Sequence, residues 1–133
     1  MSHKQIGNIA YTGVVLDEPS KKLLLERFPV PSGWTEYAHH CTLHLGAAKD
    51  QHMVGRKVSM VVIAVGQSRE ALAVRVVLPQ KAYMEGDFAE GFRKPHVTIA
   101  VAPGSKPYFS NRIEEWKETD SFTIQGTVRE VKR

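Results

Sequence analysis

Hydrophobic and polar residues alternate along several stretches of the chain. This alternation predicts β-strands, because successive strand side chains point to opposite faces. The stretches that show it are residues 7–16, 34–45, 57–65, 70–78, 96–102 and 121–131. The polar segment Gly66-Gln67-Ser68-Arg69 separates two of them, and this spacing predicts a β-hairpin. In the stretch 34–45, the alternation predicts Cys41, Leu43 and Leu45 on the inward face.

Three further features predict two helices. Asp17-Glu18-Pro19-Ser20 combines an acidic capping residue with an early proline, as at a helix start. Leu24, Leu25 and Phe28 then form an apolar stripe. A second, shorter helix is predicted over Ser110–Trp116, with its first serine as the cap.

The order of these elements is strand, helix, four strands, helix, strand. This order predicts an α+β fold in which helices cover the outer face of an antiparallel sheet. The chain has 133 residues, which fits one domain over residues 1–133. The strand that carries His40 in the first half has a counterpart with His96 in the second, so the two halves echo each other.

Composition and charge narrow the classes of partner. Apolar runs are too short to cross a bilayer, so we expect no membrane partner. The lone cysteine, Cys41, excludes an internal disulfide framework, and a reducing, cytoplasmic setting is expected. The formal net charge is +4, with scattered basic residues. This favours a small anionic substrate or a nucleic-acid end over a long duplex.

Two copies of one short motif stand out. They are His40-Cys41-Thr42-Leu43 and His96-Val97-Thr98-Ile99. Composition alone predicts roughly 0.3 His-x-Thr triplets in this chain. On a strand, each copy presents an imidazole and a hydroxyl on one face and buries two apolar side chains on the other.

Two such pairs would supply the groups that hydrolysis of a phosphodiester needs. One imidazole takes the proton of the attacking water, and the other protonates the leaving ribose oxygen. Thr42 and Thr98 would donate hydrogen bonds to the phosphate oxygens, where charge develops. The near-equivalence of the motifs leaves open which of His40 and His96 is the acid.

On these two motifs the chain resembles the 2H phosphoesterase superfamily, which is defined by two H-x-[ST]-hydrophobic motifs. The resemblance implies a bilobal, pseudo-symmetric fold with antiparallel sheets around a central cleft. It also implies catalysis by His40 and His96 without a metal or cofactor. The implied activity is hydrolysis of 2′,3′-cyclic phosphate or 2′-5′ phosphodiester bonds of RNA ends or nucleotides. The motifs lie 56 residues apart, a shorter separation than in the larger members.

Other functions remain open at this stage. The chain could hydrolyse cyclic di- or oligonucleotide signals, or bind RNA or a nucleotide without turnover. A zinc site would need His40 and His44 on one helix, whereas the alternating pattern places them on a strand, too far apart to share an ion. The oligomeric state does not follow from the sequence.

Several other side chains are candidates for substrate binding, each with a structural alternative. Tyr11 could contact a base or the phosphate, or could be a core tyrosine. Phe88 and Phe92, in the irregular segment before the second motif, could stack a nucleobase or pack that segment onto the domain. Candidate phosphate contacts that could equally be solvated charges are Arg75, Arg93 and Lys94. By alternation His39 points inward, as a packed or hydrogen-bonded histidine. His44 could lie at the rim of the cleft or be a solvent-exposed structural histidine.

Overall fold

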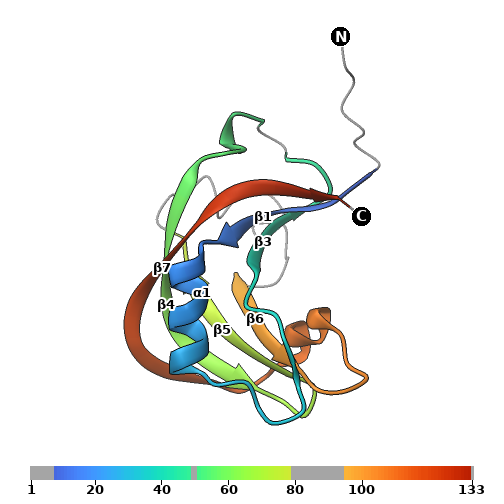
Figure 1. Ribbon diagram of the computed structural model, residues 1–133, viewed down its shortest axis with the longest axis vertical. Coiled ribbons are helices and arrows are strands. Elements are labelled where there is room, and N and C mark those ends of the chain that lie inside the picture. The colour runs from blue at the N-terminus through green and yellow to red at the C-terminus, as the bar shows by residue number, and fades with distance from the viewer. Residues whose placement is uncertain (1–7, 49–50, 79–94, 133) are drawn as a thin grey trace.

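The computed structural model describes residues 8–48, 51–78 and 95–132, and most of these residues lie in strands. The strands are β1 (Ile9–Leu16), β2 (Thr35–Glu36), β3 (His40–Leu45), β4 (Lys57–Gln67), β5 (Ala71–Val77), β6 (His96–Val101) and β7 (Trp116–Lys132). The helical segments are α1 (Glu18–Arg27) and the 3-10 helices η2 (Gln51–Met53) and η3 (Pro107–Arg112). Figure 1 shows β7 as a long arc that curves around α1.

The strands close into a barrel. Their order is β2-β6-β3-β1-β7-β4-β5, and β5 also pairs with β6. Six antiparallel strands therefore form a ring, with the short β2 beside β6. The expected α+β fold with two lobes and helices on outer faces is wrong. The two motif strands pair directly with each other in one sheet, so no division into lobes separates them.

The apolar side chains inside the ring form the main core. Side chains from β1, β3, β4, β5, β6 and β7 contribute to it, and Met60, Ile99 and Ile124 are among those with no exposed surface. The predicted first helix is confirmed, since the Asp17 carboxylate accepts a hydrogen bond from the Ser20 amide at its N-terminus. This helix adds Leu24 to the barrel core.

A second, smaller cluster lies on the outside of β5 and β6. It consists of Ala71, Ala73, Val101 and Ile113, with Tyr37, Phe109 and Trp116 packed against it. The expected helix over Ser110–Trp116 is wrong. A 3-10 turn ends at Arg112, the backbone is extended at Ile113, and β7 begins at Trp116. Packing of the indole against Gly66 on β4 overrides the local helical pattern.

Most predicted strand patterns hold, but the expected strand over 34–45 is divided into β2 and β3, with Ala38 in the left-handed region (φ 48°) between them. The hairpin of β4 and β5 is confirmed. Cys41 and Leu43 are buried as expected, but Leu45, predicted to face inward, is 60% exposed. A register shift on β3 leaves Leu43 between the pairs Gly13–Thr42 and Thr12–His44. Such a bulge resets the alternation beyond it. Within the described ranges, no helix has the length and apolar character that crossing a membrane requires.

Candidate functional site

The two motifs meet where β3 pairs with β6. Cys41 faces Val97 across this antiparallel pair, and both side chains are fully buried in the core. Side chains that precede and follow such a pair point to the opposite face of the sheet. His40, Thr42, His96 and Thr98 therefore share the outer surface of the barrel, where each is half-buried. We call this group the His–Thr face.

The two imidazoles of the His–Thr face lie close enough to influence each other. A positive charge on His96 disfavours protonation of His40 and lowers its pKa. The sequence separates the two rings by 56 positions, so this proximity comes from the non-local pairing of β3 with β6. The structure thus brings together the two histidines and two threonines that the motifs predict.

His40 is held by two neighbouring side chains. The phenol ring of Tyr11 stacks on its imidazole, with ring centroids 4.2 Å apart and an interplanar angle of 20°. The Tyr11 hydroxyl lies 3.1 Å from His40 Nδ1. His39 Nδ1 lies 3.0 Å from the same nitrogen. Both contacts engage Nδ1, so they orient the ring through one nitrogen only.

The surroundings of His40 favour its neutral form. Burial, with smaller contributions from the neighbouring His39 and His96, lowers its pKa to about 4. The imidazole is therefore neutral at pH 7 and has one nitrogen able to accept a proton. If Nδ1 carries the ring proton and donates it to Tyr11 or His39, Nε2 is that acceptor.

Gly13 makes room for this arrangement. It lies on β1 opposite Thr42, in the middle of the strand. A Cβ added to Gly13 would lie 2.8 Å from the carbonyl oxygen of Cys41 and 3.5 Å from His40 Cδ2. The close approach of the Cys41 carbonyl on β3 thus requires a residue without a side chain, next to the imidazole of His40. A glycine inside a strand pattern was the available sequence signal, since it marks a close backbone approach.

Two residues of η3 position the hydroxyl of Thr98. Its hydroxyl lies 2.7 Å from Ser110 Oγ and donates a 3.3 Å hydrogen bond to the Pro107 carbonyl oxygen. Ser110 is 1% exposed, so its hydroxyl is fixed by the packing of η3 against β6. When the Ser110 hydroxyl donates its hydrogen bond to Thr98 Oγ1, the Thr98 hydroxyl keeps its own proton to donate. It can give up the long hydrogen bond to the Pro107 carbonyl and donate to a ligand oxygen instead.

Arg75 adds a positive charge beside the His–Thr face. It pairs with His96 across β5 and β6, and its backbone neighbours Val74 and Val76 are buried. The guanidinium lies over the ring of Trp116, 4.7 Å from the ring centroid. The alternation of β5 indicated an outward side chain, but only the pairing of β5 with β6 places it next to a catalytic candidate.

Other sequence-based expectations fare differently. Tyr11, expected to contact substrate or lie in the core, is half-buried and stacks on His40. His39, expected to point inward, is exposed. Cys41 points inward as predicted, and burial raises the pKa of its thiol to about 12, so it stays protonated. The remaining candidates lie outside the described residues, and they are Phe88, Phe92, Arg93 and Lys94.

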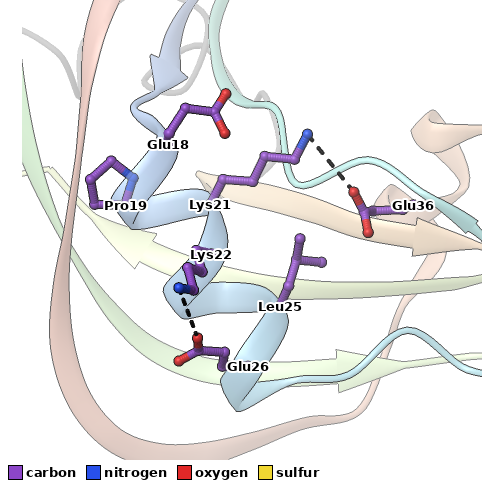
Figure 2. Close-up of a pocket in the computed structure, with 7 residues that line it drawn as sticks. All are labelled: Glu18, Pro19, Lys21, Lys22, Leu25, Glu26 and Glu36. Atoms are coloured by element: carbon purple, nitrogen blue, oxygen red, sulfur yellow. Dashed lines mark ion pairs between the residues drawn. The ribbon is translucent and has the colours of Figure 1, made fainter.

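A hollow of the surface lies beside α1 and is lined mainly by charged side chains (Figure 2). Lys21 forms an ion pair with Glu36 at 3.9 Å, and Lys22 forms one with Glu26 at 4.0 Å. Within each ion pair the two charges neutralise each other. The described residues that line the hollow include no histidine, serine or cysteine. Across the described ranges, no three His, Cys, Asp or Glu side chains gather where they could hold a metal ion.

A scan against protein-family models and a search of curated proteins each found no match for this chain. The resemblance to the 2H phosphoesterases therefore rests on the eight residues of the two motifs. The barrel differs from the bilobal fold that this resemblance implies. The geometry of the His–Thr face carries the functional interpretation.

Proposed function

We propose that the chain is a metal-independent phosphodiesterase that hydrolyses 2′,3′-cyclic phosphate or 2′-5′ phosphodiester bonds of RNA ends or nucleotides. The observation that carries this proposal is the pairing of Cys41 with Val97. That single pair turns two imidazoles and two hydroxyls from distant parts of the chain toward the same outer surface. Two proton-transfer groups and two neutral donors are the set that such a reaction uses.

His40 is the general base in this proposal. Its lowered pKa keeps it neutral at physiological pH, as a base must be before it acts. Tyr11 and His39 engage Nδ1, so Nε2 is the nitrogen that takes a proton from the attacking water. As the water oxygen forms its bond to phosphorus, the proton moves to His40 and the imidazole becomes positively charged.

His96 is the general acid. The bond between phosphorus and the leaving ribose oxygen breaks, and His96 delivers a proton to that oxygen. The products are a phosphomonoester and a free ribose hydroxyl, and proton exchange with water then restores both rings. The two imidazoles come from adjacent strands, so one ring can act on the attacking water while the other acts on the leaving group, which departs on the opposite side of phosphorus.

The threonine hydroxyls hold the phosphate between the rings. Thr98 accepts a hydrogen bond from Ser110 and donates its own proton to a non-bridging oxygen. Thr42, from the outer face of β3, does the same from the other motif. Neutral donors fix the phosphate without altering the charge balance of the two histidines.

A substrate panel with EDTA tests the proposal. The substrates are adenosine 2′,3′-cyclic monophosphate, 2′-5′-linked diadenosine and a cyclic dinucleotide. Turnover of either of the first two supports the proposal. Turnover of the cyclic dinucleotide alone would assign the site to cyclic nucleotide signals. Tight binding of all three with no turnover would identify a binding module and contradict the enzymatic role.

A further inference from the structure

Arg75 and Trp116 form a positively charged platform on the side of His96 that faces away from β3. β5 lies between β6 and β4, and Trp116 belongs to β7 on the far side of β4. The stacking of Arg75 on Trp116 therefore carries the guanidinium away from the His–Thr face. Neighbouring strands are about 4.8 Å apart, so the guanidinium lies roughly 5–10 Å from His96 along the sheet.

The guanidinium of Arg75 has unused hydrogen-bonding capacity. Its Nε is buried and has no hydrogen-bond partner among the residues that the structure describes. Glu118 lines the same groove, but no ion pair joins it to Arg75 within the described ranges. A desolvated donor on a fixed, always charged side chain is suited to an anion, and a phosphate presents two oxygens to its planar fork.

We propose that Arg75, braced by Trp116, binds the phosphate next to the scissile one, so that the substrate is the end of an oligonucleotide. This inference rests on the proposed function and names its substrate class. In an oligonucleotide that ends in a 2′,3′-cyclic phosphate, the partner of Arg75 is the phosphate on the 5′ side of the terminal nucleotide. A cyclic mononucleotide lacks that phosphate and leaves Arg75 unused.

The groove beyond Arg75 offers the oligonucleotide a path across the barrel. It has a volume of about 420 Å³ and is lined by Ile63, Ala64, Arg75, Trp116, Glu118, Thr119 and Ser121. It therefore continues the line from His96 through Arg75 toward β7. On the other flank, Arg129 pairs with Gly13 and is exposed, so it offers no comparable desolvated donor.

Kinetics on two matched substrates test the inference. The substrates are adenosine 2′,3′-cyclic monophosphate and a triadenylate that ends in a 2′,3′-cyclic phosphate. For Arg75→Gln, we expect kcat/KM on the triadenylate to fall roughly 10- to 100-fold. The value on the mononucleotide should change less than threefold. Arg75→Lys should recover only part of the loss, because lysine lacks the planar fork. Arg69→Gln, an exposed change in the β4–β5 turn, is the matched charge control.

Binding measured in EDTA separates this inference from the proposed function. The probe is a triadenylate that ends in a 3′-phosphate, so no turnover is needed. Arg75→Gln should weaken its binding and reduce the slope of log K against log salt by roughly 0.7, the value for one phosphate of a single strand. If the protein hydrolyses neither cyclic substrate nor 2′-5′-linked diadenosine, the proposed function fails, and this weakened binding still supports the subsite.

Three results would overturn the inference. Equal losses on both substrates would place Arg75 at the scissile phosphate. Unchanged kinetics and binding for Arg75→Gln would remove it from recognition. A loss of triadenylate kinetics and binding that occurs only in Arg129→Gln would indicate that the oligonucleotide binds across the opposite flank of the barrel.

Discussion

The phenol ring of Tyr11 lies flat on the imidazole of His40, and its hydroxyl is 3.1 Å from His40 Nδ1. Tyr11 belongs to β1 and His40 to β3, so this contact joins neighbouring strands on the outer side of the barrel. The stack restrains the tilt of the imidazole. The contact at Nδ1 determines that Nε2 is the nitrogen that faces away from the Tyr11 hydroxyl. Tyr11 is thus a positioning residue for the proposed base.

Tyr11→Phe separates these two restraints. The phenylalanine ring preserves the stack but removes the hydroxyl, so the imidazole loses one hydrogen-bond partner at Nδ1. We expect kcat to fall roughly 3- to 10-fold, the equivalent of one net hydrogen bond, with KM little changed. Steady-state kinetics on adenosine 2′,3′-cyclic monophosphate measure this. An unchanged kcat would show that stacking alone positions His40.

Local patterns predicted which side chains within the two four-residue motifs are buried. Cys41 and Val97 are fully buried, while His40 and His96 are not, as alternation requires. The start of α1 was equally predictable, because Asp17 caps the helix through a contact only three residues away. These features depend on neighbours in sequence, which is why the sequence reveals them.

The closure of the barrel could not be predicted in the same way. It depends on β6 pairing with both β3 and β5, and no local pattern selects those partners. The same pairings place Arg75 beside His96 and give the Thr98 hydroxyl its contact with Ser110. The sequence therefore indicates the four residues of the motifs and offers Tyr11 and Arg75 as candidates. It does not show that these two lie beside the histidines or that Ser110 contacts Thr98.

Gly13→Ala tests whether the close approach of β1 and β3 seats His40. The new methyl group would lie 2.8 Å from the Cys41 carbonyl oxygen, so the strands must separate slightly. We expect unfolding free energy to fall by about 1–3 kcal/mol, because small-to-large changes in packed sites cost that much. We also expect kcat of the folded enzyme to fall, since a shift of the Cys41 backbone also moves His40, the residue before it on β3.

Gly126→Ala is the matched control for this change. The nearest neighbours of its added methyl group would be the Val15 carbonyl and the Val14 side chain, and neither residue belongs to the His–Thr face. It should lower stability in urea unfolding and leave kcat of the folded enzyme unchanged. Equal effects of the two substitutions on kcat would attribute the loss to general loosening of β1.

The pH dependence of activity should reflect the environment of His40. The acid limb of kcat/KM reports the pKa of the base in the free enzyme. Because burial lowers the pKa of His40 to about 4, activity should persist well below pH 6 and decline near pH 4. Rates measured from pH 3.5 to 9 in buffers of constant ionic strength give this limb. A midpoint near 6.5 would indicate that His40 is solvated or that another group is the base.

Stability should also change with pH through His40. The unfolded chain binds a proton at this ring below about pH 6.5, whereas the folded protein binds it only below about pH 4. Unfolding therefore takes up a proton between these values, and stability falls as pH drops through that window, by roughly 3 kcal/mol in total. Urea unfolding at pH 7, 5.5 and 4 measures the loss.

His40→Gln provides the comparison for that titration. Glutamine does not titrate, so the variant should lose less stability than the wild type between pH 6.5 and 4. His52→Gln, at an exposed position in η2, should behave as the wild type does. A pH dependence that is identical in all three proteins would assign the acid sensitivity to other groups.

The measurement that tests the central claim most directly is hydrolysis of adenosine 2′,3′-cyclic monophosphate in EDTA by His40→Ala, His96→Ala and the double variant. If both rings act on one phosphorus, each single change should lower kcat by roughly 10²- to 10⁴-fold. The double variant should then be little worse than the poorer single variant, because the two groups work in the same transition state. Near wild-type turnover in either folded single variant would contradict the account.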